Sequence, residues 1–202
     1  ALTYFLSDLG DRDADGSHGP TDLDIASTRY ALGTGIFFHT PSGLSVITDV
    51  NFARLYGDDK EAKSSRNRRN LHVRTDIFET IVKVEYTFNR SGIYLNLGGG
   101  LCFFKPKAQL DGTWYDLRPL GTEGQNIDPE KSVYNKYTPI IPFCVGKKFE
   151  LNNNMSIAID FSFRKAFTDY LDDVSTIYYD KEAISDHSGD DAKQLSSRAS
   201  ED

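Results

Sequence analysis

Apolar and polar residues alternate along several stretches of this chain, with the period of two that a β-strand imposes. Between residues 155 and 163 every odd position is apolar, namely Met155, Ile157, Ile159, Phe161 and Phe163. The same alternation recurs in 44–52 and 78–88, and in 30–38 and 93–104 with many glycines on the second face. Because a helical period fits none of these stretches, the sequence predicts an all-β protein.

The connections between the predicted strands alternate in length. Seven strands are predicted, near residues 1–7, 29–39, 44–56, 77–88, 93–104, 139–150 and 155–167. Short turns of Gly, Pro, Asn and Ser at 40–43, 89–92 and 151–154 alternate with long polar loops at 7–28, 57–75, 105–137 and from 168 onward. Short turns at one rim and long loops at the other are typical of a small up-and-down antiparallel transmembrane β-barrel.

A bacterial barrel of this kind has an even number of strands, so eight strands are expected. With seven visible, the closing strand is expected beyond the polar C-terminal segment. The barrel domain is predicted to cover residues 1–182, and the low apolar content of 183–202 predicts a polar mobile loop or tail.

A soluble lipocalin-type barrel shares this connectivity but has its apolar face inside. Three features favour the apolar-out arrangement. The polar face carries small residues that a narrow lumen requires: Ala31, Gly33, Gly35, Ala53, Gly98 and Gly100. It also carries charges of both signs, including Arg29, and the apolar face ends in aromatic residues at both rims. We therefore predict a barrel of the bacterial outer membrane.

The charges predicted to face the lumen form a polar network of six residues: Asp49, Glu79, Lys83, Glu85, Asp160 and Arg164. They could line a pore. We favour mutual neutralisation, because side chains just fill the interior of an eight-stranded barrel and opposite charges pair there.

Composition narrows the function classes further. The 202 residues carry a net charge of −7, which argues against a nucleic-acid partner. No apolar run is long enough for a membrane-spanning helix. The two cysteines, Cys102 and Cys144, both fall on the predicted lumen face, where a disulfide and two free thiols remain alternatives.

No catalytic or metal-binding set emerges from the sequence. The four histidines are scattered and no nucleophile motif is present, so we expect neither an enzyme nor a cofactor. The acidic run Asp11, Asp13 and Asp15, with Asp22 further on, has the spacing of a calcium loop. Pro20 interrupts it, so a solvated acidic loop is favoured and calcium binding stays open.

Four segments carry a resemblance to a known family. They are 53–60 (ARLYGDDK), 69–79 (RNLHVRTDIFE), 117–125 (LRPLGTEGQ) and 164–175 (RKAFTDYLDDVS). Together they resemble the PorG-like outer-membrane β-barrels of the Bacteroidota type IX secretion system. The resemblance implies a non-enzymatic role in protein secretion, associating with the periplasmic ring of the PorK lipoprotein and PorN and helping to anchor or assemble it.

Our hypothesis is that the short-turn rim contacts this ring. The candidate partner-binding residues are Pro41, Ser42, Gly43, Asn89, Arg90, Ser91, Gly92, Asn152, Asn153 and Asn154. Outer-membrane lipid is a further expected partner, and the basic run 66–69 could face lipopolysaccharide or be a solvated loop. The alternative function is a surface adhesin or ligand-binding barrel that acts through its long outer loops.

Overall fold

The computed structural model describes residues 2–3, 29–58, 72–88, 91–122, 124–125, 127–129, 131, 133–152, 155–168, 170–173 and 179–196. Its strands are β1 (Leu2–Thr3), β2 (Arg29–His39), β3 (Leu44–Asp58), β4 (His72–Thr87), β5 (Ile93–Leu110), β6 (Thr113–Asp116), β7 (Tyr137–Asn152) and β8 (Met155–Ala166). Its helices are α1 (Leu117–Leu120), the 3-10 turn η5 (Tyr170–Asp172), α2 (Lys181–Ser188) and α3 (Asp190–Ser196).

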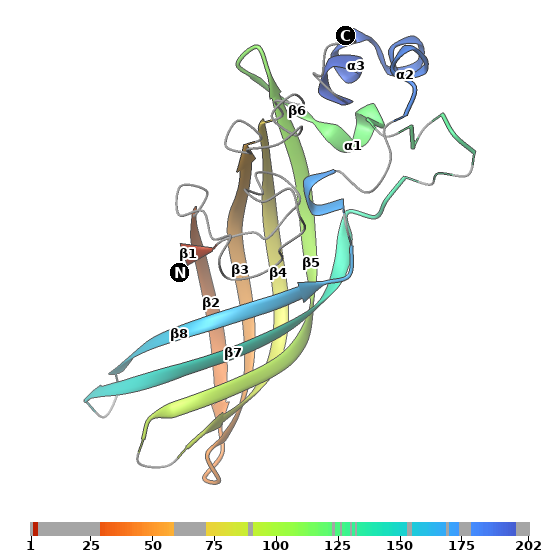
Figure 1. Cartoon of the computed structure of the whole chain (residues 1–202). Coiled ribbons are helices and arrows are strands. Elements are labelled where there is room, and N and C mark those ends of the chain that lie inside the picture. The colour runs from red at the N-terminus through yellow and green to blue at the C-terminus, as the bar shows by residue number, and fades with distance from the viewer. Residues whose placement is uncertain are drawn as a thin grey trace, which may run out of the picture.

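The strands form one antiparallel sheet in the order β1-β2-β3-β4-β5-β7-β8, and β6 pairs with β5 alone. The sheet curls until β7 and β8 cross in front of β2–β5, which leaves a half-barrel open between β2 and β8 (Figure 1). This up-and-down order confirms the predicted all-β, open-barrel fold. We call the end with the connections 40–43, 88–92 and 152–155 the turn end, and the opposite end the loop end.

The two faces of the sheet are reversed relative to a water-soluble domain. On the turn-end half of β4, Val82 and Val84 point outward and are 52% and 53% exposed. The charged side chains point inward, where Glu79 and Glu85 are 4% and 2% exposed. Since successive strand residues point to opposite faces, this single alternation separates the barrel from a lipocalin-type fold with an apolar interior.

At the loop end the strands run further than predicted. β4 begins at His72 and β5 continues to Leu110, where it turns back into β6. The turn residues Asp111 and Gly112 have φ angles of 48° and 81°, as a tight two-residue hairpin turn requires. The prediction of a loop over 105–137 was therefore wrong for 105–120, because these strand ends lie beyond the apolar belt and carry polar outward residues.

The prediction of a mobile tail over 183–202 was also wrong in the part that the structure describes. Residues 181–196 form α2 and α3, and the Asp180 carboxylate caps α2 by accepting a hydrogen bond from the Glu182 amide (2.9 Å). Three apolar side chains suffice to seat these short helices: Ile184, Ala192 and Leu195 are all buried. Leu195 packs with Val73, Ala108, Leu110 and Leu117 at the loop end.

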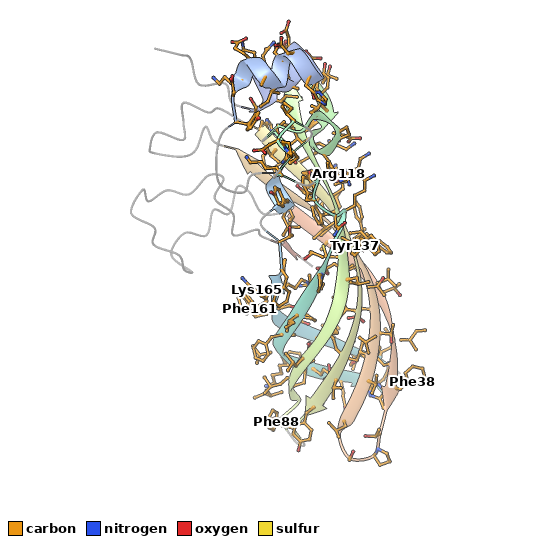
Figure 2. All side chains as sticks on the ribbon, turned by 90° about the vertical axis from the view of Figure 1, so that its right-hand side faces the viewer. Phe38, Phe88, Arg118, Tyr137, Phe161 and Lys165 are labelled. Atoms are coloured by element: carbon orange, nitrogen blue, oxygen red, sulfur yellow. The ribbon has the colours of Figure 1, made fainter. Side chains whose placement is uncertain are left out.

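Labelled side chains mark the two ends and the middle of the molecule. Figure 2 shows Phe38 and Phe88 at the turn end, Tyr137 about halfway along the molecule, and Arg118 beyond it toward the helices.

Among the described residues, no helix combines the length and apolarity needed to cross a membrane.

Candidate functional site: the lumen and its two rims

Three ion pairs occupy the lumen, two of them toward the turn end and the third, Glu79–Arg164, about halfway along the strands. Lys83 pairs with Asp49, Lys148 pairs with Glu85, and Arg164 Nε lies 2.9 Å from Glu79 Oε2. Each pair joins different strands, and the acidic partners Glu79 and Glu85 are almost fully buried. The charges of this part of the lumen thus largely neutralise one another.

Aromatic side chains surround Lys148 inside the lumen. Its ammonium lies 4.9 Å from the Tyr94 ring centre and 5.9 Å from that of Phe37. The Tyr94 hydroxyl donates a hydrogen bond to Asp160 Oδ2 (2.7 Å). A Cβ at Gly146 would lie 2.6 Å from the Tyr94 hydroxyl oxygen, so only glycine leaves room for this ring.

All six predicted lumen residues therefore lie on the inner face, five in ion pairs and Asp160 bonded to Tyr94. The sequence analysis missed Lys148 and Tyr94 as members of the same network. Both stand at even positions of predicted strands, on the lumen face, so the alternation itself carried the signal.

A different kind of cluster fills the lumen at the loop end. Leu171 of η5 and Tyr134 are each 8% exposed and pack against inward side chains of β3, β4, β5 and β7: Ala53, Leu55, Ile77, Ile81, Cys102, Phe104 and Ile140. The Tyr134 ring stacks between Phe104 (6.0 Å) and Tyr170 (4.6 Å). We call Tyr134 and 170–173 the plug.

Asp173 anchors the plug. Its carboxylate accepts hydrogen bonds from the Thr122 hydroxyl (2.5 Å) and from the Tyr134 hydroxyl. The Thr75 hydroxyl donates to the carbonyl oxygen of Leu171 (2.5 Å), which joins the plug to β4. Asp173 is 3% exposed, so it is a buried anchor rather than a solvated loop charge.

The four segments that carry the family resemblance converge on this plug. Ala53 and Leu55 come from the first, Thr75 from the second, Thr122 from the third, and Leu171 and Asp173 from the fourth. Segments far apart in sequence thus meet in one buried cluster at the loop end.

Beyond the plug lie β6 and the helices α1, α2 and α3, which we call the cap (Figure 1). Arg118 of α1 donates a hydrogen bond from Nε to the Tyr134 carbonyl oxygen (2.9 Å). The negative charge of Asp191 on α3, reinforced by a hydrogen bond to the same carboxylate, raises the pKa of the Tyr115 hydroxyl on β6. Helix α1 of the cap is therefore bonded to the plug, and helix α3 to strand β6.

The turn end is simple by comparison. Thr40 and Gly43 close the first turn through a 3.3 Å amide-to-carbonyl hydrogen bond, and Pro41 and Ser42 stand exposed at its tip. Of the other candidate partner-binding residues, Ser91 and Asn152 are exposed and Gly92 is partly buried. Asn89, Arg90, Asn153 and Asn154 lie outside the described residues.

The two cysteines are free and buried. Cys102 is paired in register with Thr138 of β7, six positions along that strand from Cys144, or about 20 Å at the rise of a strand. The disulfide alternative is thereby excluded. The candidate calcium loop with Asp11, Asp13, Asp15 and Asp22 lies outside the described residues, and the described part holds no cluster of three or more potential metal ligands among His, Cys, Asp and Glu.

These observations define the class of protein: an open antiparallel β-barrel whose apolar face points outward and whose inner face carries ion pairs and a buried plug. No protein-family model matches the chain, and neither a curated protein nor a solved structure matches it significantly.

Proposed function

We propose that this chain is a non-enzymatic outer-membrane component of the type IX protein secretion system that associates with the periplasmic PorK–PorN ring and helps to anchor or assemble it. The observation that carries the proposal is the convergence of the four PorG-like segments on one buried plug. The segments that resemble the family therefore contribute residues that contact one another in the folded chain.

The outward apolar belt supports placement in a membrane. It runs from Leu44 to Phe52 on β3 and from Phe78 to Tyr86 on β4, close to the roughly nine to eleven residues that a tilted strand needs to cross the hydrocarbon core. At the loop end a row of aromatic side chains closes the belt: Phe52, Phe78, Phe103 and Tyr137 are consecutive partners across β3, β4, β5 and β7.

The ion pairs and the plug on the inner face support a structural role over transport of solutes. Ion pairs neutralise its charges toward the turn end, and the plug replaces water with apolar side chains toward the loop end. In outer-membrane barrels the short turns face the periplasm, so the turn end is the side that meets a periplasmic ring.

The test is affinity purification of the full-length protein from the native envelope. We expect PorK and PorN to co-purify. Pro41→Arg and Ser42→Arg together place two charges at the exposed tip of the first turn while keeping Gly43, whose φ of 81° the turn requires. This variant should lose most of the ring subunits while the barrel still fractionates with the outer membrane.

A control places one arginine at the opposite end. Thr113→Arg, at an exposed position of the β5–β6 hairpin, should retain the ring. If the turn variant and the control recover equal amounts of PorK and PorN, the proposed contact is refuted.

The alternative of a surface adhesin or ligand-binding barrel is favoured by one observation, the cap of β6 and α1–α3 beyond the belt (Figure 1). Its signature in the same experiment is an outer-membrane barrel that brings down no ring and whose ligand binding is lost on substitution in the cap.

A further inference from the structure

The outward face of the sheet changes character just beyond the aromatic row at the loop end. Two rows of polar residues follow: Arg54, Asp76 and Lys105 in the first, and Tyr56, Arg74, Lys107 and Asp116 in the second. Four of these seven side chains are basic and two are acidic. We call these two rows, together with Trp114, the collar.

Acidic groups neutralise only part of the collar. Arg54 Nε lies 2.5 Å from Asp76, while Lys105 and Lys107 share the one Asp116 carboxylate at 2.8 and 3.3 Å. Within the part of the chain that the structure describes, Arg74 has no carboxylate partner. The collar therefore keeps a net positive charge in a chain whose overall charge is −7.

Arg74 lies flat on the Trp114 indole, with its Cζ 4.2 Å from the ring centre. Its Nε is buried and has no hydrogen-bond partner among the described residues. The Arg74–Trp114 contact holds the guanidinium in place on the outward face of β4. A basic side chain held against an aromatic ring is typical of the polar boundary of a bilayer.

The height of the collar matches a headgroup layer. Its first row lies two residues beyond the aromatic row, or about 7 Å along the strand. The headgroup region adds roughly 5–8 Å to each side of the hydrocarbon core. The outward face at the turn end offers no counterpart, because it remains apolar through Phe38, Leu44, Tyr86 and Ile93, with Lys147 its one basic residue among those described.

We propose that the collar binds the phosphate groups of anionic lipid headgroups in the leaflet at the loop end. A lipid is the occupant that fits because the positive charge is continuous with the apolar belt on the same outward face. Arginine and lysine donors are well suited to phosphate oxygens. The inference rests on the membrane placement proposed above and adds a leaflet preference to it.

The test compares the full chain in vesicles of phosphatidylcholine alone with vesicles that also contain lipid A. Thermal unfolding, followed by the fluorescence of the single Trp, gives a midpoint in each composition. We expect lipid A to raise the midpoint of the wild type, and high salt to shrink this increment. The triple variant Arg74→Gln, Lys105→Gln, Lys107→Gln should lose at least half of it.

Two controls make the result specific. Lys147→Gln removes a basic side chain from the same outward face at the turn end and should retain the full increment. Lys105→Arg with Lys107→Arg keeps the charge and should also retain it. If the triple variant fails to insert, Lys105→Gln alone replaces it, since Lys105 is 59% exposed and its loss leaves the core intact. This single variant should lose a smaller but measurable part of the lipid A increment.

Three outcomes would overturn the proposal: no increment in the wild type, equal increments in wild type and collar variants, or the same increment from inorganic phosphate in neutral vesicles. The last would mean a free-anion site. Failure of the chain to insert into any vesicle would refute the membrane placement, whereas insertion and ring co-purification without a lipid A increment would refute the collar alone.

Discussion

The two ends of the lumen are filled in opposite ways. Toward the turn end, charged residues on nearby strands pair with one another, as in Lys83–Asp49 and Lys148–Glu85. Toward the loop end, an apolar plug from a distant part of the chain enters between the strands, and the Thr75–Leu171 hydrogen bond joins residues 96 positions apart. The first arrangement follows from the strand period and the curl of the sheet, and the second depends on a loop folding back.

This contrast has an energetic side. A buried ion pair recovers the desolvation cost of its charges only while both partners are present. A buried leucine contributes through the apolar area removed from water and through its packing. Loss of one residue should therefore affect the turn-end lumen more than the loop-end lumen, while loss of a whole pair should be tolerated.

The largest effect is expected from Glu85→Leu. It leaves the Lys148 ammonium without its carboxylate, and removing one partner of a buried pair costs about 3–5 kcal/mol. We expect about 3 kcal/mol here, because Lys148 keeps 22% of its side chain exposed. Urea unfolding of the full chain in phosphatidylcholine vesicles, followed by Trp fluorescence, measures the loss.

The double variant Glu85→Leu, Lys148→Met is the matched control. It removes both charges and should recover most of the lost stability. If the double variant is as unstable as the single one, the ion pair is not the reason for the loss.

At the other end, Leu171→Ala should cost about 2 kcal/mol through lost burial and a residual cavity, the low end of the range for a buried leucine, because Leu171 is 8% exposed. We also expect it to release the plug, which would raise ion conductance across a planar bilayer and expose 170–173 to protease. Leu151→Ala, at a position 57% exposed on the turn-end side, should change neither. Unchanged conductance and proteolysis in Leu171→Ala would show that the plug is held by other contacts.

Asp173→Asn separates the charge of the plug anchor from its shape. Asparagine tolerates the φ of 65° at this position, but its amide nitrogen cannot accept from Thr122 or Tyr134 as the second carboxylate oxygen does. We expect a loss of about 1–2 kcal/mol from the unmade hydrogen bond. Asp173→Ala should be worse, because it loses both acceptors and adds backbone strain; equal stability of the two variants would argue against the anchor.

How far the sequence could predict these regions follows from the same contrast. Alternation placed Glu79, Glu85 and Arg164 on one face, and the curl of the sheet brings β4, β7 and β8 close enough for their charges to pair. The Asp111–Gly112 turn also had a recognisable signal, since Asp-Gly between two alternating stretches favours a hairpin. The turn depends on neighbouring residues alone, and the inward position of the charges depends on the strand period alone.

The plug and the helices had no comparable signal. Asp173 stands in an acidic stretch that is typical of a solvated loop, and only its distant partners Thr122 and Tyr134 make its burial favourable. The helices α2 and α3 have few apolar residues, and Leu195 becomes a core residue because side chains of β4, β5 and α1 pack against it. Tertiary contacts decide both regions.

The smallest effect is expected in the collar, from titration of Asp116. Burial alone would raise the pKa of this carboxyl, but the Lys105 and Lys107 ammonium groups outweigh it and hold the pKa below its ordinary value. A carboxyl whose folded pKa is depressed contributes stability above its unfolded pKa, and this contribution is lost as the pH falls through the lower, folded pKa. Because the Asp116 side chain is 38% exposed and screened by solvent, we expect a difference of no more than about 0.5 kcal/mol between pH 7 and the acid side of this titration. Urea unfolding of the wild type and of Asp116→Asn at both pH values measures this difference. The gap in stability between the two proteins should be present at pH 7 and vanish in acid. A gap that persists in acid would mean that Asp116 acts through its shape.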